Sequence, residues 1–211
     1  MRTTTIFAAL LAAFTLTASG ATLSPISYSM PNGGGFPGYE DETYSSPNCP
    51  NCPGYLSGGL GQLTDGITTP SFFPDEGGTF STMVGWTFDP EIFFYFDSTQ
   101  SFGQVQIHLS DAHGRAGIAL PSSIDILIGS TTLTFNPVAQ NETGSLNEWH
   151  SFNTQGLSGD SVKVTLHRSQ TFEFVDEFAF VGGAAAAPEP STMILGGTAL
   201  ALVGFLRRKH R

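Results

Sequence analysis

The chain has 211 residues, of which 12% are charged, about half the usual share of a soluble domain. Its 25 glycines, 13 prolines and 12% aromatic content are typical of a turn-rich all-β domain and exclude a coiled coil. Residues 22–188 include three basic and 17 acidic side chains, a net charge of −14. Because such a surface repels phosphate backbones, we expect no nucleic-acid partner, whereas divalent cations suit it.

The first 21 residues have the pattern of a secretory signal peptide. Arg2 supplies the positive start, an apolar run spans residues 6–16, and small residues around Gly20 offer a cleavage site. We therefore expect residues 1–21 to form a signal helix that is removed on export.

Residues 22–61 are rich in Gly, Pro, Ser and Asn, which predicts an irregular arm with one edge strand near residues 25–30. The arm holds the only two cysteines, Cys49 and Cys52. In an exported protein such a pair most often forms a disulfide, and free thiols are the alternative. A redox or zinc role would need a βαβ unit or a second cysteine pair, and the sequence has neither pattern.

Period-two alternation of apolar side chains recurs from about residue 88 onward, in short runs separated by turn residues. The predicted strands are 91–97, 104–109, 123–128, 131–135, 161–167 and 172–181. In the last of these, alternation places Phe172, Phe174, Phe178 and Phe180 on one face. The pattern predicts an all-β fold, a two-sheet antiparallel β-sandwich over residues 62–183.

Five short motifs occur in order across residues 55–183. They are Leu63–Gly66 (LTDG), Val84–Trp86 (VGW), Ile107–His108, Leu120–Ser122 (LPS) and Val175–Phe178 (VDEF). In this order they resemble the galactose-binding-like jelly roll of the discoidin, or coagulation-factor C-type, group. The resemblance implies that the sandwich is a jelly roll.

The same resemblance implies a structural calcium ion. In that family the ion often lies where an Asp-Gly turn meets an acidic residue of the last strand, and these are Asp65 and Glu177 here. Ca²⁺ takes six to eight oxygen ligands, and the carbonyls of Leu63 or Gly66 and the carboxylate of Asp176 are further candidates. The alternative is that Asp65 only shapes a turn and that Glu177 is a solvated strand residue.

Contact with a sugar needs an exposed aromatic face beside hydrogen-bonding groups. The candidates are Trp86, Trp149, Tyr55 and the loop 111–117, which carries His113 and Arg115. The alternative for both tryptophans is that they fill the core of the sandwich.

Nothing in the sequence indicates catalysis. The chain has no Gly-x-Ser-x-Gly motif, and its five histidines have no metal-ligand spacing. Alternation predicts that His108 and His167 point outward, so we expect solvated surface histidines. We expect a protein without enzymatic activity.

The chain ends in three elements that follow the linker 184–187. These are Pro188-Glu189-Pro190, an apolar run over residues 193–206 and a basic tail from Arg207 to Arg211. The run is shorter than the ~20 residues of an ordinary membrane span, and its basic end is expected to stay cytoplasmic.

This order over residues 188–211 resembles the PEP-CTERM sorting signal of Gram-negative bacteria, also catalogued as the ice-binding protein C-terminal signature. The resemblance implies a precursor anchored in the inner membrane by a short apolar helix. It also implies an exosortase partner that cuts near the motif and releases the protein to the cell surface or the medium.

The sequence thus predicts a non-enzymatic exported protein of the cell surface or extracellular matrix, associated with exopolysaccharide or biofilm. A carbohydrate-binding module for exopolysaccharide is the alternative, and a secreted hydrolase is the third. Ice binding would need a flat Thr-rich face, for which Thr131, Thr132 and Thr134 are too few.

Overall fold

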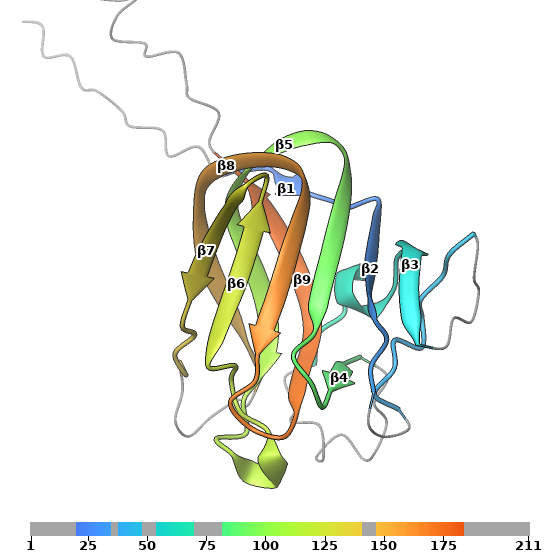
Figure 1. Cartoon of the computed structure of the whole chain (residues 1–211), viewed down its shortest axis with the longest axis vertical. Coiled ribbons are helices and arrows are strands. Elements are labelled where there is room, and N and C mark those ends of the chain that lie inside the picture. The colour runs from blue at the N-terminus through green and yellow to red at the C-terminus, as the bar shows by residue number, and fades with distance from the viewer. Residues whose placement is uncertain (1–19, 35–37, 48–53, 70–81, 141–146, 184–211) are drawn as a thin grey trace, which may run out of the picture.

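The computed structural model describes residues 20–34, 38–47, 54–69, 82–140 and 147–183. Figure 1 shows that this part of the chain is almost entirely β-sheet. The strands are β1 (Thr22–Leu23), β2 (Ser27–Pro31), β3 (Tyr55–Gly59), β4 (Val84–Trp86), β5 (Glu91–Ser110), β6 (Ser123–Ile128), β7 (Thr131–Phe135), β8 (Asn147–His167) and β9 (Glu173–Gly182), with the 3-10 helices η1 (Gln62–Thr64) and η3 (Arg115–Gly117). Residues 1–19, Cys49, Cys52 and the C-terminal segment 184–211 lie outside the described residues.

Two long strands, β5 and β8, run through both layers of the sandwich. Residues 91–95 of β5 and 161–167 of β8, together with β2, β3, β6 and β7, form what we call the first layer. Residues 104–110 of β5 and 147–153 of β8, together with β1, β4 and β9, form the second layer. The pairing of β5 with β8 shifts between Tyr95 and Gln100 and again between Phe102 and Gln104. Near these shifts both strands curve over, at the top of Figure 1. Such bends let one strand join two sheets.

The predicted all-β antiparallel sandwich is therefore confirmed. The two strands predicted over residues 91–97 and 104–109 are the halves of β5. The sequence pattern missed the first half of β8. In the run that starts at Asn147, the exposed position holds the apolar Trp149 and the buried position holds the polar His150, which is the reverse of simple alternation.

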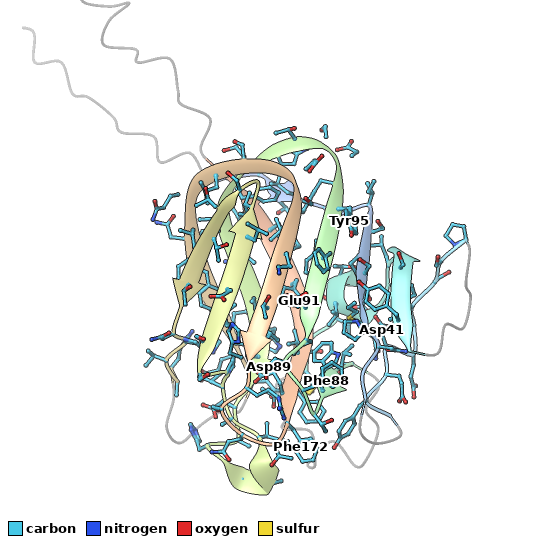
Figure 2. The ribbon with its side chains drawn as sticks, in the orientation of Figure 1. Asp41, Phe88, Asp89, Glu91, Tyr95 and Phe172 are labelled. Carbon is cyan, nitrogen blue, oxygen red and sulfur yellow. The ribbon has the colours of Figure 1, made fainter. Side chains whose placement is uncertain are left out.

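The segment 22–61 is more regular than the predicted irregular arm. Its strand β2 lies between β3 and β5 rather than at an edge. The Tyr28 hydroxyl donates a hydrogen bond to the carboxylate of Asp41, which lies beside β2 and β3 (Figure 2). Asp41 also accepts the backbone N–H of Gln62 at 3.1 Å. Because Tyr28 and Met30 are fully buried, this segment completes the first layer and its core.

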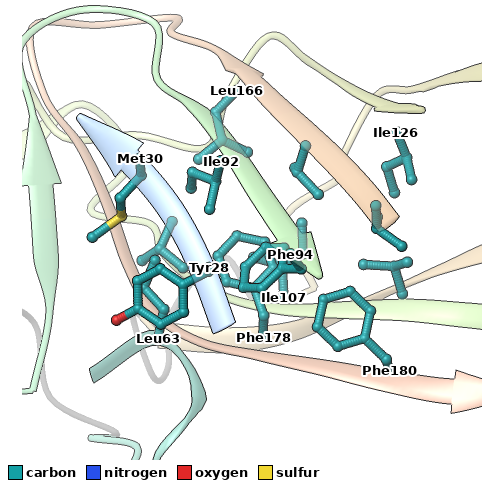
Figure 3. Packing of buried hydrophobic residues seen from close by; sticks show 14 of the residues in the cluster. Tyr28, Met30, Leu63, Ile92, Phe94, Ile107, Ile126, Leu166, Phe178 and Phe180 are labelled. Carbon is teal, nitrogen blue, oxygen red and sulfur yellow. The ribbon is translucent and has the colours of Figure 1, made fainter. Parts of the chain in front are cut away.

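Aromatic side chains join the two layers. The ring of Phe94, from the first layer, lies 4.7 Å from that of Phe178 and 4.9 Å from that of Phe180, both from the second layer. Phe96 meets Phe180 edge-on at 5.2 Å. Figure 3 shows Phe94, Phe178 and Phe180 packed together beside Tyr28. Such tilted and edge-on pairs add to the free energy that burial of the rings supplies.

A β-bulge at Asp176 divides strand β9. His108 of β5 pairs with Glu177, and the next residue, Leu109, pairs with Val175. Asp176 is therefore the extra residue that opposes no partner, as in a bulge.

The bulge reverses the alternation of side chains along β9. Phe178 and Phe180 lie in the main core, whereas Phe172 and Phe174 pack against Tyr39 in a separate cluster. The prediction that these four phenylalanines share one face is wrong. The inserted residue moves the side chains that follow it to the face opposite to the one that strict alternation predicts.

We expect Tyr28→Phe to destabilise the fold by about 1–3 kcal/mol, because it leaves the buried Asp41 carboxylate without one of its donors. Tyr55→Phe is the matched control, since Tyr55 is 54% exposed. Denaturant unfolding measures both. Equal stability of the two variants would show that the Tyr28–Asp41 hydrogen bond does not hold the 22–61 segment in place.

Candidate functional site

A pocket of about 570 Å³ lies over the outer face of β9. Because Phe178 and Phe180 point into the core, Glu177 and Ala179 face outward and form its floor. The sheet order places β1 on one side of β9, and β8 beyond β5 on the other. The other lining residues are Thr22, Leu23, Ser24, Pro25, Leu60, Thr64, Asp65, Gly66, Thr68, Trp149, Phe178 and Phe180.

Glu177, His108 and Trp149 form one row across the second layer. His108 of β5 pairs with Glu177 of β9 on one side and with Trp149 of β8 on the other. Two strand spacings separate β9 from β8, so the backbones at Glu177 and Trp149 are roughly 10 Å apart. Trp149 is 38% exposed, and its ring lies 5.1 Å from the buried His108 ring, tilted by 50°.

Asp176 holds the central residue of this row, His108, in position. Nδ1 of His108 donates to Oδ2 of Asp176 at 3.0 Å, and the backbone N–H of Thr69 donates to the same oxygen at 2.6 Å. The two contacts join β5, β9 and the segment that follows η1. They explain why His108 is buried and not solvated as predicted.

Glu177 closes the turn that follows η1. Its Oε2 accepts the backbone N–H of Gly66 at 2.9 Å, and the N–H of Asp65 also donates to this carboxyl. The side chain is only 5% exposed. Burial raises the pKa of Glu177 to about 8, and the negative charge of Asp65 adds to this, while the hydrogen bond from Gly66 opposes it.

Asp65 shapes the same turn. Its Oδ1 accepts the backbone N–H of Ile67 at 2.8 Å, the pattern of an Asx-turn, and Gly66 adopts φ +77°. The structure thus brings Asp65 and Glu177 to one place, as the sequence predicted. Asp65 does shape a turn, and the expectation that Glu177 is a solvated strand residue is wrong.

The residues fit a calcium ion only in part. Two carboxyl groups meet, but each already accepts backbone N–H groups of the turn. Among the described residues, no group of three or more His, Cys, Asp or Glu side chains is placed to hold a metal ion. Calcium at Asp65 and Glu177 stays a prediction.

Of the predicted sugar contacts, only Trp149 lines the pocket. Trp86 is fully buried in the main core, where its Nε1–H donates to the carbonyl of Pro31 at 2.9 Å. It cannot stack on a ligand, so this prediction is wrong and the core alternative is confirmed. Arg115 lies in η3 and His113 lies just before it, and neither lines the pocket. His113 instead lies 3.3 Å from the carboxylate of Asp111.

The histidines differ from the prediction of solvated side chains. His150, like His108, is buried, and burial lowers its pKa. His167 is partly exposed between Asp125 at 3.0 Å and Asp89 at 3.5 Å, and its hydrogen bond with Asp125 raises its pKa. Only His167 and His113 keep substantial exposure among the described histidines.

Sequence reasoning missed several lining residues of the pocket. Leu60 and Pro25 belong to the segment that was predicted to be irregular, so no register placed them beside β9. Ala179 carried a signal: it is a small outward residue between two core phenylalanines, which leaves room above the strand.

Comparison with known families gives two matches. The family described as "Discoidin domain-containing receptor 1/2, DS-like domain" matches residues 25–181. The PEP-CTERM protein-sorting motif matches residues 186–209, which include Pro188, Glu189 and Pro190. No curated protein matches the chain.

Solved structures of similar proteins include several carbohydrate-binding modules. The CBM32 of AlyQ in complex with 4,5-unsaturated mannuronic acid is 14% identical, with a TM-score of 0.44, and the match covers 77% of this chain and 99% of that one. A fucose binding module of Streptococcus pneumoniae is 16% identical, with a TM-score of 0.40, over 67% of this chain and 89% of that one. The GH31 CBM32-2 bound to GalNAc is 16% identical, with a TM-score of 0.38, over 59% and 88%.

No helix among the described residues is long and apolar enough to cross a membrane. The apolar run over residues 193–206 lies outside those residues.

If calcium binds at Asp65 and Glu177, it should raise the melting temperature. A ligand at a hundredfold excess over Kd stabilises by about 2.7 kcal/mol, which corresponds to roughly 5–11 °C for a domain of this size. The rise should be larger above pH 8 than at pH 6, because the proton on Glu177 competes with the ion. Thermal melting in EDTA, calcium and magnesium measures it.

Asp65→Ala and Glu177→Ala should each remove that rise, and magnesium should substitute poorly because it sheds water reluctantly. Equal shifts in the wild type and both variants, or equal effects of the two ions, would reduce the effect to charge screening. The calcium prediction would then be wrong.

Proposed function

This chain belongs to the family of the DS-like domain of discoidin domain-containing receptors 1 and 2, and on that premise we propose that it is an exported, non-enzymatic glycan-binding protein. It acts at the cell surface or in the extracellular matrix, where exopolysaccharide is its partner. The pocket over β9 is the binding site.

The exposed ring of Trp149 beside this pocket is the observation that carries the proposal. A sugar ring presents C–H groups on one face, which pack on an aromatic ring, and hydroxyls at its edge, which need hydrogen-bonding partners. The pocket supplies the ring of Trp149, the carboxyl groups of Glu177 and Asp65, and hydroxyl side chains at Thr22, Thr64 and Thr68.

The C-terminal signal supports the place of action. A PEP-CTERM motif implies export and processing by an exosortase, with a precursor anchored in the membrane. An acidic body with a net charge of −14 between residues 22 and 188 stays soluble outside the cell and does not bind polyanions by charge alone.

The carboxyl pair at the pocket does not support a hydrolase. A glycosidase needs one carboxyl group on each side of the scissile bond, some 5–10 Å apart. Here both groups hold one turn: backbone N–H groups of the turn donate to Glu177 of β9, and a third N–H donates to Asp65. We therefore assign them to binding and expect oligosaccharides to be recovered intact.

Trp149→Ala should abolish binding of the exported protein on a glycan array, because the stacking surface is lost while the fold is kept. Val138→Ala is the control, since Val138 is exposed and does not line the pocket. Arg115→Ala tests the loop at η3 in the same experiment and should leave binding unchanged. Binding that survives Trp149→Ala but is lost in Arg115→Ala would move the site to that loop and contradict the proposal.

A further inference from the structure

The charges around the pocket restrict the kind of glycan that it can hold. Two carboxyl groups, Asp65 and Glu177, line it, and none of the described lining residues is Lys, Arg or His. The described basic side chains lie elsewhere: Lys163 pairs with Glu91 at 2.8 Å, Arg168 pairs with Asp89 at 3.1 Å, and Arg115 lies in η3. A uronic acid or a sulfated sugar would place its negative charge beside these carboxyl groups with no counter-charge.

A positively charged sugar removes this conflict. The ammonium group of an amino sugar donates up to three hydrogen bonds, and charge-assisted bonds to a carboxylate are about twice as strong as neutral ones. The ring of Trp149 also attracts a cation through its π-face. The pocket thus has an apolar platform at one end and carboxyl groups at the other.

The geometry fits an oligosaccharide and not a single ring. Trp149 and Glu177 belong to strands that are roughly 10 Å apart, with His108 between them. One sugar ring can stack on Trp149 while the amino group of a neighbouring ring reaches Glu177 and Asp65. His108 is held in a fixed position between them by its hydrogen bond with Asp176.

We propose that the pocket over β9 binds a glycan that carries free, non-acetylated amino groups, with Trp149 as the stacking platform and Glu177 and Asp65 as partners of the ammonium group. This inference rests on the proposed glycan-binding function and names the class of sugar. It follows from the pairing of an exposed indole with two carboxyl groups in a pocket whose described lining residues include no basic side chain.

The experiment is calorimetric titration of the full exported protein at about pH 6 with two tetrasaccharides of the same backbone. One is fully deacetylated chitotetraose and the other is fully N-acetylated chitotetraose, and an oligomannuronate serves as the anionic probe. We expect the deacetylated form to bind at least about tenfold more tightly than the acetylated one, the preference to shrink at high salt, and the oligomannuronate not to bind.

The variants separate the pocket from the overall charge. Glu177→Gln should remove the preference, and Glu91→Gln, which removes a carboxylate from the first layer (Figure 2), should keep it. Asp65→Asn, which keeps an acceptor for Ile67, should weaken the preference and serves if Glu177→Gln does not fold. Trp149→Ala should abolish binding of both tetrasaccharides.

Three results would overturn the inference in different ways. Equal binding of the two tetrasaccharides, lost in Trp149→Ala, would contradict the amino-sugar preference and leave glycan binding at the pocket in place. A preference that is equally weakened by Glu91→Gln would reduce it to attraction by the acidic body. Failure of both tetrasaccharides and of every array glycan to bind would overturn the proposed function together with the inference.

Discussion

Asp176 accepts hydrogen bonds from the His108 ring of β5 and from the backbone N–H of Thr69, and these contacts hold the bulge of β9 in place. The bulge lets Val175 and Phe178 both face the main core although they are three residues apart. It also places the buried Asp176 next to Glu177, so that one residue ties the strand to the segment after η1 and the next closes the turn of that segment. The core and the pocket over β9 therefore depend on the same inserted residue.

The bend in β5 and β8 is the second feature on which the arrangement depends. It turns one continuous sheet into two layers, and it allows Phe94 and Phe178 to meet across the core at 4.7 Å. Without the bend, the second half of β5 would continue the first layer and no row from Glu177 to Trp149 would face outward.

Period-two alternation was sufficient to predict the sandwich, because residues 91–96, 123–128 and 161–167 bury every second side chain. The same rule failed at β9, since an inserted residue is invisible to a fixed period. The strand predicted near residues 25–30 exists as β2, but the Gly, Pro and Ser residues around Tyr28 and Met30 did not indicate that it lies between β3 and β5. These are the places where tertiary contacts, such as the Tyr28–Asp41 hydrogen bond, decide the local structure.

The site was predictable in its pieces but not in its assembly. The ordered motifs placed Asp65 and Glu177 together, because the turn after η1 lies beside β9. Nothing in the residues next to Trp149 and Trp86 showed which of the two is exposed. Only the strand register shows that Trp149 faces the pocket and that Trp86 fills the core. The contribution of Leu60 and Pro25 to the pocket depends on how the segment 22–61 folds over the second layer.

A crystal structure of the exported protein with bound chitotetraose tests the central claim most directly. The account predicts one sugar ring in van der Waals contact with the indole of Trp149, about 3.5–4.0 Å away, and an amino group within hydrogen-bond distance of Glu177. A sugar bound at the loop of His113 and Arg115, with the pocket over β9 unchanged, would contradict it.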